Sequence, residues 1–319
     1  MNSPRVSIII LNWNGLEDTI ECLESMRKIT YSNYEVIVVD NNSAGDDVRV
    51  LKESFGDYIH IIENDKNYGF AKGNNAGIKH VLQKDSPYVL LLNNDTVVDP
   101  EFLDELVMVA EGDRRRGIVC PMIYWYDQPQ ALWCVERMKV DLYRGICTQK
   151  RIKDSKQLVI ESGFAPGAAM LIRRETLQKI GLLPESYFFG VEDIDYSINA
   201  LRSGFTIAVA TRARVWHKGT KKISSAGISN HYRSWQIMRR RYLSTPAYVI
   251  ATFSALTWAI LRSITPLFRY IFRGEFRELC NFFLKMVAAL RGTIEGVIWR
   301  SNESPSKDMP PGEHSLLKQ

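Results

Sequence analysis

Short apolar runs alternate along the first two-thirds of the chain with segments in which apolar residues recur at helical spacing. The runs occupy residues 6–11, 35–40, 58–63, 88–92, 118–122 and 206–210. Their β-branched composition, without polar alternation, predicts strands buried on both faces of a largely parallel sheet. Ile20, Leu23 and Met26 lie on one face of a predicted helix over residues 17–28. The first three elements therefore predict a βαβ unit.

Later segments extend this alternation of strands and helices. Residues 67–77, rich in glycine and asparagine, open a predicted helix, and a further helix begins at Pro100. Residues 163–174 predict another strand, and residues 175–180 predict a short helix that Gly181 ends. The order of the elements predicts an α/β fold with a mostly parallel central sheet and flanking helices.

Residues 123–161 are rich in aromatic side chains that interleave with polar and charged residues. The aromatic residues include Tyr124, Trp125, Tyr126, Trp133 and Tyr143. We favour the core of a small sheet as their role, and stacking of exposed aromatics on the rings of a ligand stays open as the alternative.

Polar residues follow three of the predicted strands. Asn12 and Asn14 come after the first strand, Asp40 after the second, and Asn93 and Asp95 after the fourth. Parallel strands end at one sheet edge, where α/β proteins bind ligands, so we expect these side chains to meet. A carboxylate beside amides suits a hard divalent cation that also carries phosphates. For Asp40, an Asx-turn that merely closes the strand is the local alternative.

The glycines of residues 67–77 permit close approach of the backbone, and the asparagine amides there can cap a helix or contact a ligand. The alternative is a loop that leads into a helix start tolerant of glycine. No Gly-x-Gly-x-x-Gly follows the first strand, which argues against a dinucleotide-binding site.

Three carboxylates, Glu192, Asp193 and Asp195, crowd the first turn of a predicted helix behind an aromatic pair and a glycine. Acidic side chains suit a helix N-terminus, because the unpaired N–H groups there carry partial positive charge. Helix capping is therefore one interpretation of this run, and a chemical site is the other. Clustered acids need a cation or donors nearby, since mutual repulsion otherwise raises a pKa.

The net charge of +5 hides an uneven distribution along the 319 residues. Residues 212–300 contain 16 lysines and arginines and three acids, whereas residues 1–211 contain 23 basic and 30 acidic residues. An acidic N-terminal part joined to a basic C-terminal part indicates that the C-terminal part binds an anionic partner.

The five cysteines are widely spaced and include no Cys-x-x-Cys pair. This spacing supports neither a zinc site nor a disulfide framework, and it fits a reducing compartment. The N-terminus lacks the shape of a signal peptide. We therefore expect a cytoplasmic protein.

An uncharged stretch, residues 242–261, lies between the arginines of residues 239–241 and Arg262. Basic residues interleaved with aromatics favour helices that lie in the headgroup region of an anionic membrane, through residues 239–300. Packed helices, including an oligomer interface, rank second, and a true membrane span ranks third. No nucleic acid is expected, because no nucleic-acid-binding motif accompanies the basic charge. Residues 301–319 predict a disordered tail.

Four motifs in order resemble those of glycosyltransferase family 2, and its rhamnosyltransferase-like branch most closely. They are Val-Ser-Ile-Ile-Ile-Leu-Asn-Trp-Asn-Gly at residues 6–15, Val-Val-Asp-Asn-Asn-Ser at 38–43, Asn-x-Gly-Phe-Ala-x-Gly-Asn-Asn at 67–75 and Leu-Asn-Asn-Asp at 92–95.

The resemblance extends to about residue 217 and implies the GT-A (nucleotide-diphospho-sugar transferase) fold with Mg²⁺ or Mn²⁺. It divides the chain into a catalytic domain over residues 1–217 and a basic helical region over residues 218–300. Within the domain, residues 1–122 form the nucleotide-binding half and residues 123–217 the acceptor half.

The resemblance also implies roles for individual residues. Asp40 would contact the base of the donor nucleotide, with the backbone near Asn12 and Asn14 covering it. The other donor-binding residues are Asn67, Gly73, Asn74, Asn93 and Gly167.

Asp95 and His217 would hold the cation on the diphosphate. Asn93 replaces the first acid of the family's Asp-x-Asp motif, which puts strict metal dependence in doubt. Lys218 and the lysines after it would close over the diphosphate.

In the acidic run, Asp193 matches the family's catalytic base, and Glu192 would be its hydrogen-bonding neighbour. Asp195 is the second choice for the base. The implied activity is that of an inverting glycosyltransferase of the hexosyltransferase type, with dTDP-rhamnose favoured as donor.

The acceptor would be a glycan or a polyprenyl-linked precursor of a cell-surface polysaccharide. The basic C-terminal region, residues 239–300, would bring the enzyme to the inner face of the cell membrane as a peripheral protein. A catalytically idle sugar-nucleotide- or glycan-binding protein is the alternative, and a nucleotidyltransferase ranks below both.

Overall fold

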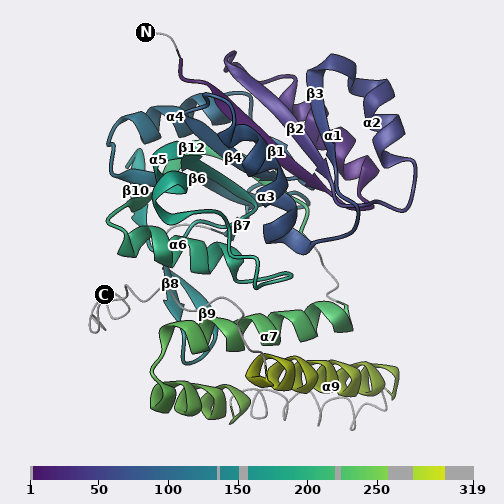
Figure 1. The fold of residues 1–319 in the computed structure, drawn as a ribbon, viewed down its shortest axis with the longest axis vertical. Helices are drawn as coiled ribbons and strands as arrows, with labels where there is room; N and C mark the ends of the chain where they lie inside the picture. The colour runs from purple at the N-terminus through teal and green to yellow at the C-terminus, as the bar shows by residue number, and fades with distance from the viewer. Residues whose placement is uncertain (1–2, 135–136, 151–156, 220–223, 258–275, 299–319) are drawn as a thin grey trace. The chain divides into compact units, whose positions relative to one another are not determined.

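The computed structural model describes residues 3–134, 137–150, 157–219, 224–257 and 276–298. The chain divides into two compact units. Unit 1 comprises Met1–Lys139, Gln149–Glu185 and Glu192–Thr220, and unit 2 comprises Val140–Thr148, Ser186–Val191 and Lys221–Gln319. Unit 1 contains every predicted site residue, and unit 2 contains the last helices (Figure 1).

Within the described residues, ten strands form one sheet in the order β10-β12-β6-β11-β4-β1-β2-β3, with β5 paired to β12 and β7 to β6. The strands are β1 (Val6–Asn12), β2 (Tyr34–Asp40), β3 (Ile59–Glu63), β4 (Tyr88–Asn93), β5 (Thr96–Val98), β6 (Arg116–Trp125), β7 (Leu132–Cys134), β10 (Val159–Ser162), β11 (Ala169–Arg173) and β12 (Thr206–His217). Strands β1 to β4 are mutually parallel, whereas β11 runs antiparallel to both β4 and β6. The sheet is therefore mixed, with one parallel half.

Helices cover both faces of this sheet (Figure 1). They are α1 (Leu16–Met26), α2 (Asp47–Phe55), the short 3-10 helix η1 (Gly56–Tyr58), α3 (Gly69–Leu82), α4 (Phe102–Glu111), α5 (Arg174–Ile180) and α6 (Glu192–Arg202). The buried side chains of α1, α2 and α4 join one hydrophobic core, and those of α3, α5 and α6 join the other.

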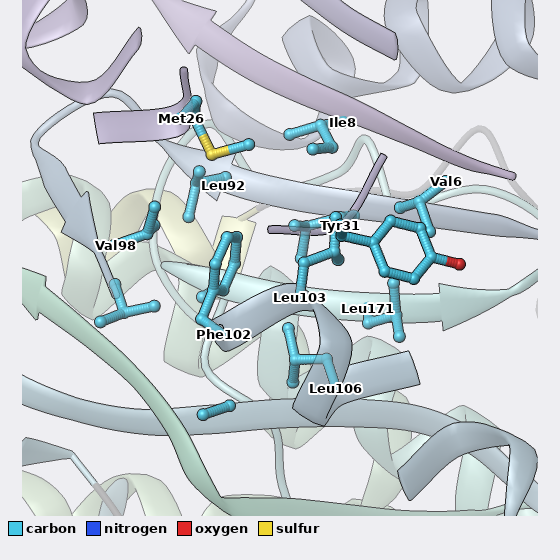
Figure 2. Packing of buried hydrophobic residues seen from close by; sticks show 14 of the residues in the cluster. Val6, Ile8, Met26, Tyr31, Leu92, Val98, Phe102, Leu103, Leu106 and Leu171 are labelled. Atoms are coloured by element: carbon cyan, nitrogen blue, oxygen red, sulfur yellow. The ribbon is translucent and has the colours of Figure 1, made fainter. Parts of the chain in front are cut away.

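Alternate residues of β1 feed these two cores, which is why its sequence is apolar throughout. Ile8 packs with Met26 of α1 and Phe102 of α4 on one face (Figure 2). Ile9 points to the opposite face, towards α3. There a Cβ on Gly77 would lie 2.7 Å from Ile9 Cγ2, so this glycine permits close packing of α3 on the sheet.

The structure adds elements that the apolar pattern did not predict. Helix α2 is one of them: Val48, Leu51 and Phe55 recur at helical spacing, with Leu51 and Phe55 buried, but no helix was predicted over these residues. In the aromatic-rich stretch, β8 (Arg137–Asp141) and β9 (Ile146–Lys150) form a separate two-stranded sheet. Strands β7 and β10 of the same stretch join the main sheet instead.

Unit 2 contains α7 (Ser225–Tyr242), a helix over residues 245–257 and α9 (Phe276–Ile298). The Ser224 side chain caps α7 by accepting a hydrogen bond from the Gly227 N–H. Helix α9 turns two glycines towards α7. A Cβ on Gly296 would lie 2.6 Å from Gln236 Cβ, and one on Gly292 would collide with the Ser229 carbonyl oxygen. Small residues thus allow the two helix backbones to approach closely.

No helix in the described ranges is long and apolar enough to cross a membrane. Part of the stretch 242–261 and the whole of the predicted tail, residues 301–319, lie outside the described residues.

Candidate active site

The predicted polar residues lie in register at one edge of the sheet. Asn12 of β1 pairs with Asp40 of β2, and Leu11 pairs with Asn93 of β4. The register follows from the parallel arrangement, in which the three strands end together. The amides and the carboxylate therefore meet at the carboxyl ends of the strands, as predicted.

Asp40 is buried, with 3% of its surface exposed. Its Oδ2 accepts a hydrogen bond from the Ser43 N–H at 2.9 Å, and its Oδ1 accepts one from the Ser43 hydroxyl at 2.7 Å. These contacts tie Asp40 to the loop after β2 through an N–H three residues on, whereas an Asx-turn would use the N–H two residues on. Oδ1 also accepts a bond from Asn12 Nδ2 at 2.9 Å. Because an oxygen that accepts the Ser43 N–H still has a second lone pair, Oδ2 has capacity for a further donor.

The Asn12 amide binds a second carboxylate that the sequence reasoning missed. Its Nδ2 donates to Asp47 Oδ2 at 2.9 Å as well as to Asp40. Asp47 is buried in the first turn of α2, where negative charge is favourable. Helix α2 was not predicted, so Asp47 was not expected at this edge; the signal that could have found it is the acidic pair Asp46-Asp47 before residues at helical spacing.

Asn14 closes the loop that follows β1. It has a φ of 52°, a left-handed conformation that asparagine tolerates. Its N–H donates to the Ser43 hydroxyl at 2.8 Å, and its Oδ1 accepts from the Ala44 N–H at 2.7 Å. The two loops after β1 and β2 therefore hold one another.

The amides of residues 67–74 are bonded within the protein. Asn67 Oδ1 accepts from Asn41 Nδ2 at 2.9 Å, and Asn74 Nδ2 donates to the Phe70 carbonyl at 3.0 Å. Gly73 packs against β1, because a Cβ there would lie 2.7 Å from Leu11 Cδ1. These contacts set the start of α3 beside the strand ends, and donor contact by these residues stays a prediction.

Asp95 and His217 lie side by side, as predicted. His217 Nε2 lies 3.0 Å from Asp95 Oδ1 and 3.4 Å from Asn93 Nδ2. The pair forms because His217 ends β12 opposite Thr96 of β5, which directly follows Asp95. Asp95 itself occupies the two-residue turn between β4 and β5.

Burial and hydrogen bonding compete at Asp95. Burial alone would raise its pKa, but the hydrogen bond and electrostatic interaction with His217 outweigh burial, so the pKa lies below its usual value. His217 is itself buried and packs edge-on against Trp133, and its Nδ1 has no hydrogen-bond partner among the described residues. Across the described residues, no group of three or more His, Cys, Asp or Glu side chains forms a metal cluster.

Gly167 joins Asp193 to this edge. The Gly167 N–H donates to Asp193 Oδ2 at 2.9 Å, and the Ile194 N–H donates to Oδ1 at 2.8 Å. The next residue, Ala168, accepts a hydrogen bond from the Asn93 N–H at 2.9 Å. One dipeptide therefore bridges the end of β4 and the carboxylate of Asp193. A side chain on Gly167 would meet Phe70 Cζ at 3.1 Å, so the bridge is closely packed.

Burial raises the pKa of Asp193 above its usual value, although backbone N–H groups, including those of Gly167 and Ile194, act in the opposite direction. A carboxylate of raised pKa is a stronger base than an ordinary aspartate, which suits it to accept a proton. Glu192 and Asp195 are both buried in the same first turn of α6.

Lys218 differs from its sequence-based expectation. Its ammonium contacts Asp18 Oδ1 at 2.5 Å and Glu21 Oε2 at 2.6 Å, both on α1. The side chain therefore points to acids of the protein, because these are the anions within its reach. Lys221 and Lys222, which were expected to act with it, lie outside the described residues.

The sequence profile described as glycosyl transferase family 2 matches residues 7–181, more than half of the chain. The chain belongs to glycosyl transferase family 2. Curated relatives include the low-salt glycan biosynthesis hexosyltransferase Agl10 of Haloferax volcanii, 25% identical over 75% of each chain. The dTDP-rhamnosyl transferase RfbF of Shigella flexneri is 22% identical over 78% of this chain and 80% of its own.

Solved structures with the GT-A fold show the same architecture. GalNAc-T7 with UDP, GalNAc and Mn²⁺ matches with a TM-score of 0.61 and 17% identity, over 74% of this chain and 48% of that one. The mannosyltransferase PcManGT of Pyrobaculum calidifontis, with GDP-Man and Mn²⁺, gives a TM-score of 0.57 and 16% identity, over 91% and 87%. The predicted fold and family are confirmed, and the chain is a family 2 glycosyltransferase.

Proposed function

We propose that this glycosyltransferase inverts the anomeric centre of a hexose as it moves the sugar from a nucleoside diphosphate to a glycan or polyprenyl-linked acceptor. The observation that carries the proposal is the Gly167–Ala168 bridge. Its two hydrogen bonds confine Asp193 to within about 10 Å of the Asn93 backbone, given the ~3.8 Å spacing of consecutive Cα atoms. A base and a phosphate-binding edge at this separation can serve one sugar ring.

Asp193 acts as the general base in this proposal. Its carboxylate takes the proton of an acceptor hydroxyl while that oxygen attacks the anomeric carbon from the face opposite the diphosphate. The new glycosidic C–O bond forms as the bond to the diphosphate breaks, and the nucleoside diphosphate leaves. The Gly167 and Ile194 N–H groups hold the carboxylate for this step. Glu192 is proposed to support Asp193, and Asp195 remains the second choice for the base.

Asp40 is proposed to read the base, with Asn12 and Asn14 shaping the loop around it. Oδ2 of Asp40 would accept a hydrogen bond from the base, as its remaining capacity allows. Asn67, Gly73 and Asn74 would border this part of the site.

The residues present fit a divalent cation. Asp95 offers a carboxylate of lowered pKa, and His217 Nε2, which lies 3.0 Å from Asp95 Oδ1, is the ring nitrogen that could reach the same ion. One carboxylate and one histidine suffice when the donor's phosphates and water complete the coordination shell. When bound, Mg²⁺ or Mn²⁺ would supply positive charge for the departing diphosphate. Asn93 would contribute its amide to the same edge.

For the donor we propose dTDP-rhamnose as the first candidate. The similarity to RfbF, which is named a dTDP-rhamnosyl transferase, supports this choice. Asn93 supports it as well, because an amide in place of an acid brings no second charge to the ribose side of the site.

For the acceptor's location we propose the inner face of the cell membrane. Helix α9 leaves a row of large apolar side chains exposed: Phe283, Leu284, Val287, Leu290, Ile294, Val297 and Ile298. By helical spacing these side chains lie opposite the glycines that face α7. An apolar helix face in a region rich in arginine suits the headgroup layer of an anionic membrane.

The test is a screen of dTDP-, UDP- and GDP-sugars with Mg²⁺ or Mn²⁺, read by thermal shift and then by transfer to polyprenyl-linked glycans. We expect a donor-specific stabilisation and an inverted product linkage. Binding of a nucleotide sugar without hydrolysis or transfer to any acceptor would instead support the idle binding protein, an alternative motivated by Asn93. Release of diphosphate from a nucleoside triphosphate would support a nucleotidyltransferase.

A further inference from the structure

A buried hydroxyl lies between the two ends of the proposed donor site. Thr19 of α1 has no exposed surface. Its Oγ1 lies 2.8 Å from Asn12 Oδ1 and 2.8 Å from the Gly15 carbonyl, and it accepts a hydrogen bond from Asn94 Nδ2 at 2.9 Å. Asn12 belongs to the Asp40 end of the site, and Asn94 directly precedes Asp95.

The orientation of Asn12 fixes the direction of this network. Asn12 Nδ2 faces the carboxylates of Asp40 and Asp47, so its Oδ1 must face Thr19. In the reverse orientation the amide oxygen of Asn12 would face the carboxylate oxygens of Asp40 and Asp47, and none of these oxygens carries a proton for a hydrogen bond. The hydroxyl proton of Thr19 is shared between Asn12 Oδ1 and the Gly15 carbonyl, and its lone pairs accept the hydrogen bond from Asn94.

Asn94 depends on the same hydroxyl for its position. Its other contacts, to Asn12 Oδ1 and the Gly15 carbonyl, are each 3.4 Å long. Gly15 leaves room for this amide, because a Cβ there would lie 2.5 Å from Asn94 Nδ2. Asn94 and Asp95 form the two-residue turn between β4 and β5, so the first turn residue is anchored by α1 and the second by His217.

We propose that Thr19 is a positioning residue that couples recognition of the nucleoside base at Asp40 to cation-assisted binding of the diphosphate at Asp95. The inference rests on the proposed function and deepens it. A nucleoside diphosphate spans a limited distance from base to phosphates. Its affinity is therefore higher when the distance between Asp40 and Asp95 is set before the ligand binds. Thr19 sets that spacing through Asn12 on one side and Asn94 on the other.

The experiment measures the affinity of the full chain for dTDP, UDP and GDP by calorimetry, once with Mn²⁺ and once with a chelator. The dissociation constant with the chelator, divided by that with Mn²⁺, measures the coupling between cation and nucleotide. We expect Thr19→Val to lower this ratio about tenfold, because the variant loses the hydrogen bonds that position Asn12 and Asn94. Thr19→Ser keeps the hydroxyl and should restore the wild-type ratio.

Two further variants separate coupling from general stability. Thr176→Val removes a buried hydroxyl that bonds the Gly117 carbonyl beyond the opposite end of β11, and it should leave the ratio unchanged. Gly15→Ala displaces the Asn94 amide while Thr19 stays intact, and it should lower the ratio even where Thr19→Val fails to fold.

If Thr19→Val leaves the ratio unchanged, or weakens nucleotide binding equally with and without Mn²⁺, the proposed coupling is wrong. The proposed donor site would not be affected by that result. Failure of the wild-type chain to bind any of the three nucleotides would overturn the donor site and this inference together.

Discussion

The backbone N–H of Gly167 donates a hydrogen bond of 2.9 Å to Asp193 Oδ2, across 26 positions of sequence. It ties the first turn of α6 to the residue that precedes Ala168, whose carbonyl binds the end of β4. The carboxylate proposed as the base is thereby held by the same backbone that borders the donor edge. A shift of this backbone would move the proposed base and the sugar site together.

Replacing Asp193 by asparagine should remove the base and preserve donor binding. We expect kcat to fall by about 10²–10⁴-fold, the usual contribution of general-base catalysis, with nucleotide affinity within about twofold of wild type. Steady-state kinetics and calorimetry measure the two quantities. Glu161→Gln, at an exposed position of β10, is the matched control. Full transfer activity in Asp193→Asn would exclude Asp193 as the base and direct attention to Asp195.

Asp193 should also make stability depend on pH. Because burial raises its pKa, the folded protein binds more protons than the unfolded chain between the usual pKa of 3.8 and the raised value. The stabilising contribution of the protonated form is full below pH 3.8 and is lost as the pH rises through the raised pKa. Urea unfolding across this range should therefore show the difference between Asp193→Asn and wild type shifting in favour of the variant as pH rises. A difference that does not vary with pH would contradict the raised pKa.

Asp95→Asn should weaken nucleotide binding only when a cation is present. The substitution removes the one carboxylate that we propose as a metal ligand, so the gain in affinity from Mn²⁺ should fall by about tenfold or more, a loss of roughly 1.4 kcal/mol. Calorimetry with Mn²⁺ and with a chelator measures this gain. Asp57→Asn, at an exposed position of η1, should behave as wild type. Equal loss in both conditions would show that Asp95 acts without a cation.

The exposed face of α9 should bind anionic membranes. We expect the double variant Val287→Gln, Leu290→Gln to lose most sedimentation with phosphatidylglycerol vesicles, because each side chain contributes roughly 1.5–3 kcal/mol when fully buried. Met108→Gln, which changes a similarly exposed apolar residue on α4, is the control and should retain binding. If the wild-type chain does not bind vesicles but forms dimers that the double variant cannot form, the exposed face of α9 is an oligomer interface.

The amino-acid sequence by itself determined the strands that carry the site and the edge at which they end. Strand β1 was readable because it is buried on both faces, and burial leaves a continuous apolar run. The polar residues after that run, Asn12 and Asn14, and their counterparts Asp40 and Asp95, follow from strand order alone. The family resemblance added their expected roles, which strand order could not supply.

Only the tertiary structure decided which side chains meet across the edge. Asp47 contacts Asn12 across 35 positions of sequence, and Lys218 contacts Asp18 across 200. Periodicity records which face of an element is buried, and it holds no information about the partner on that face. The pattern shows Thr19 only as one polar residue of a helix, and its place between Asn12 and Asn94 follows from the packing of α1 against β1 and β5.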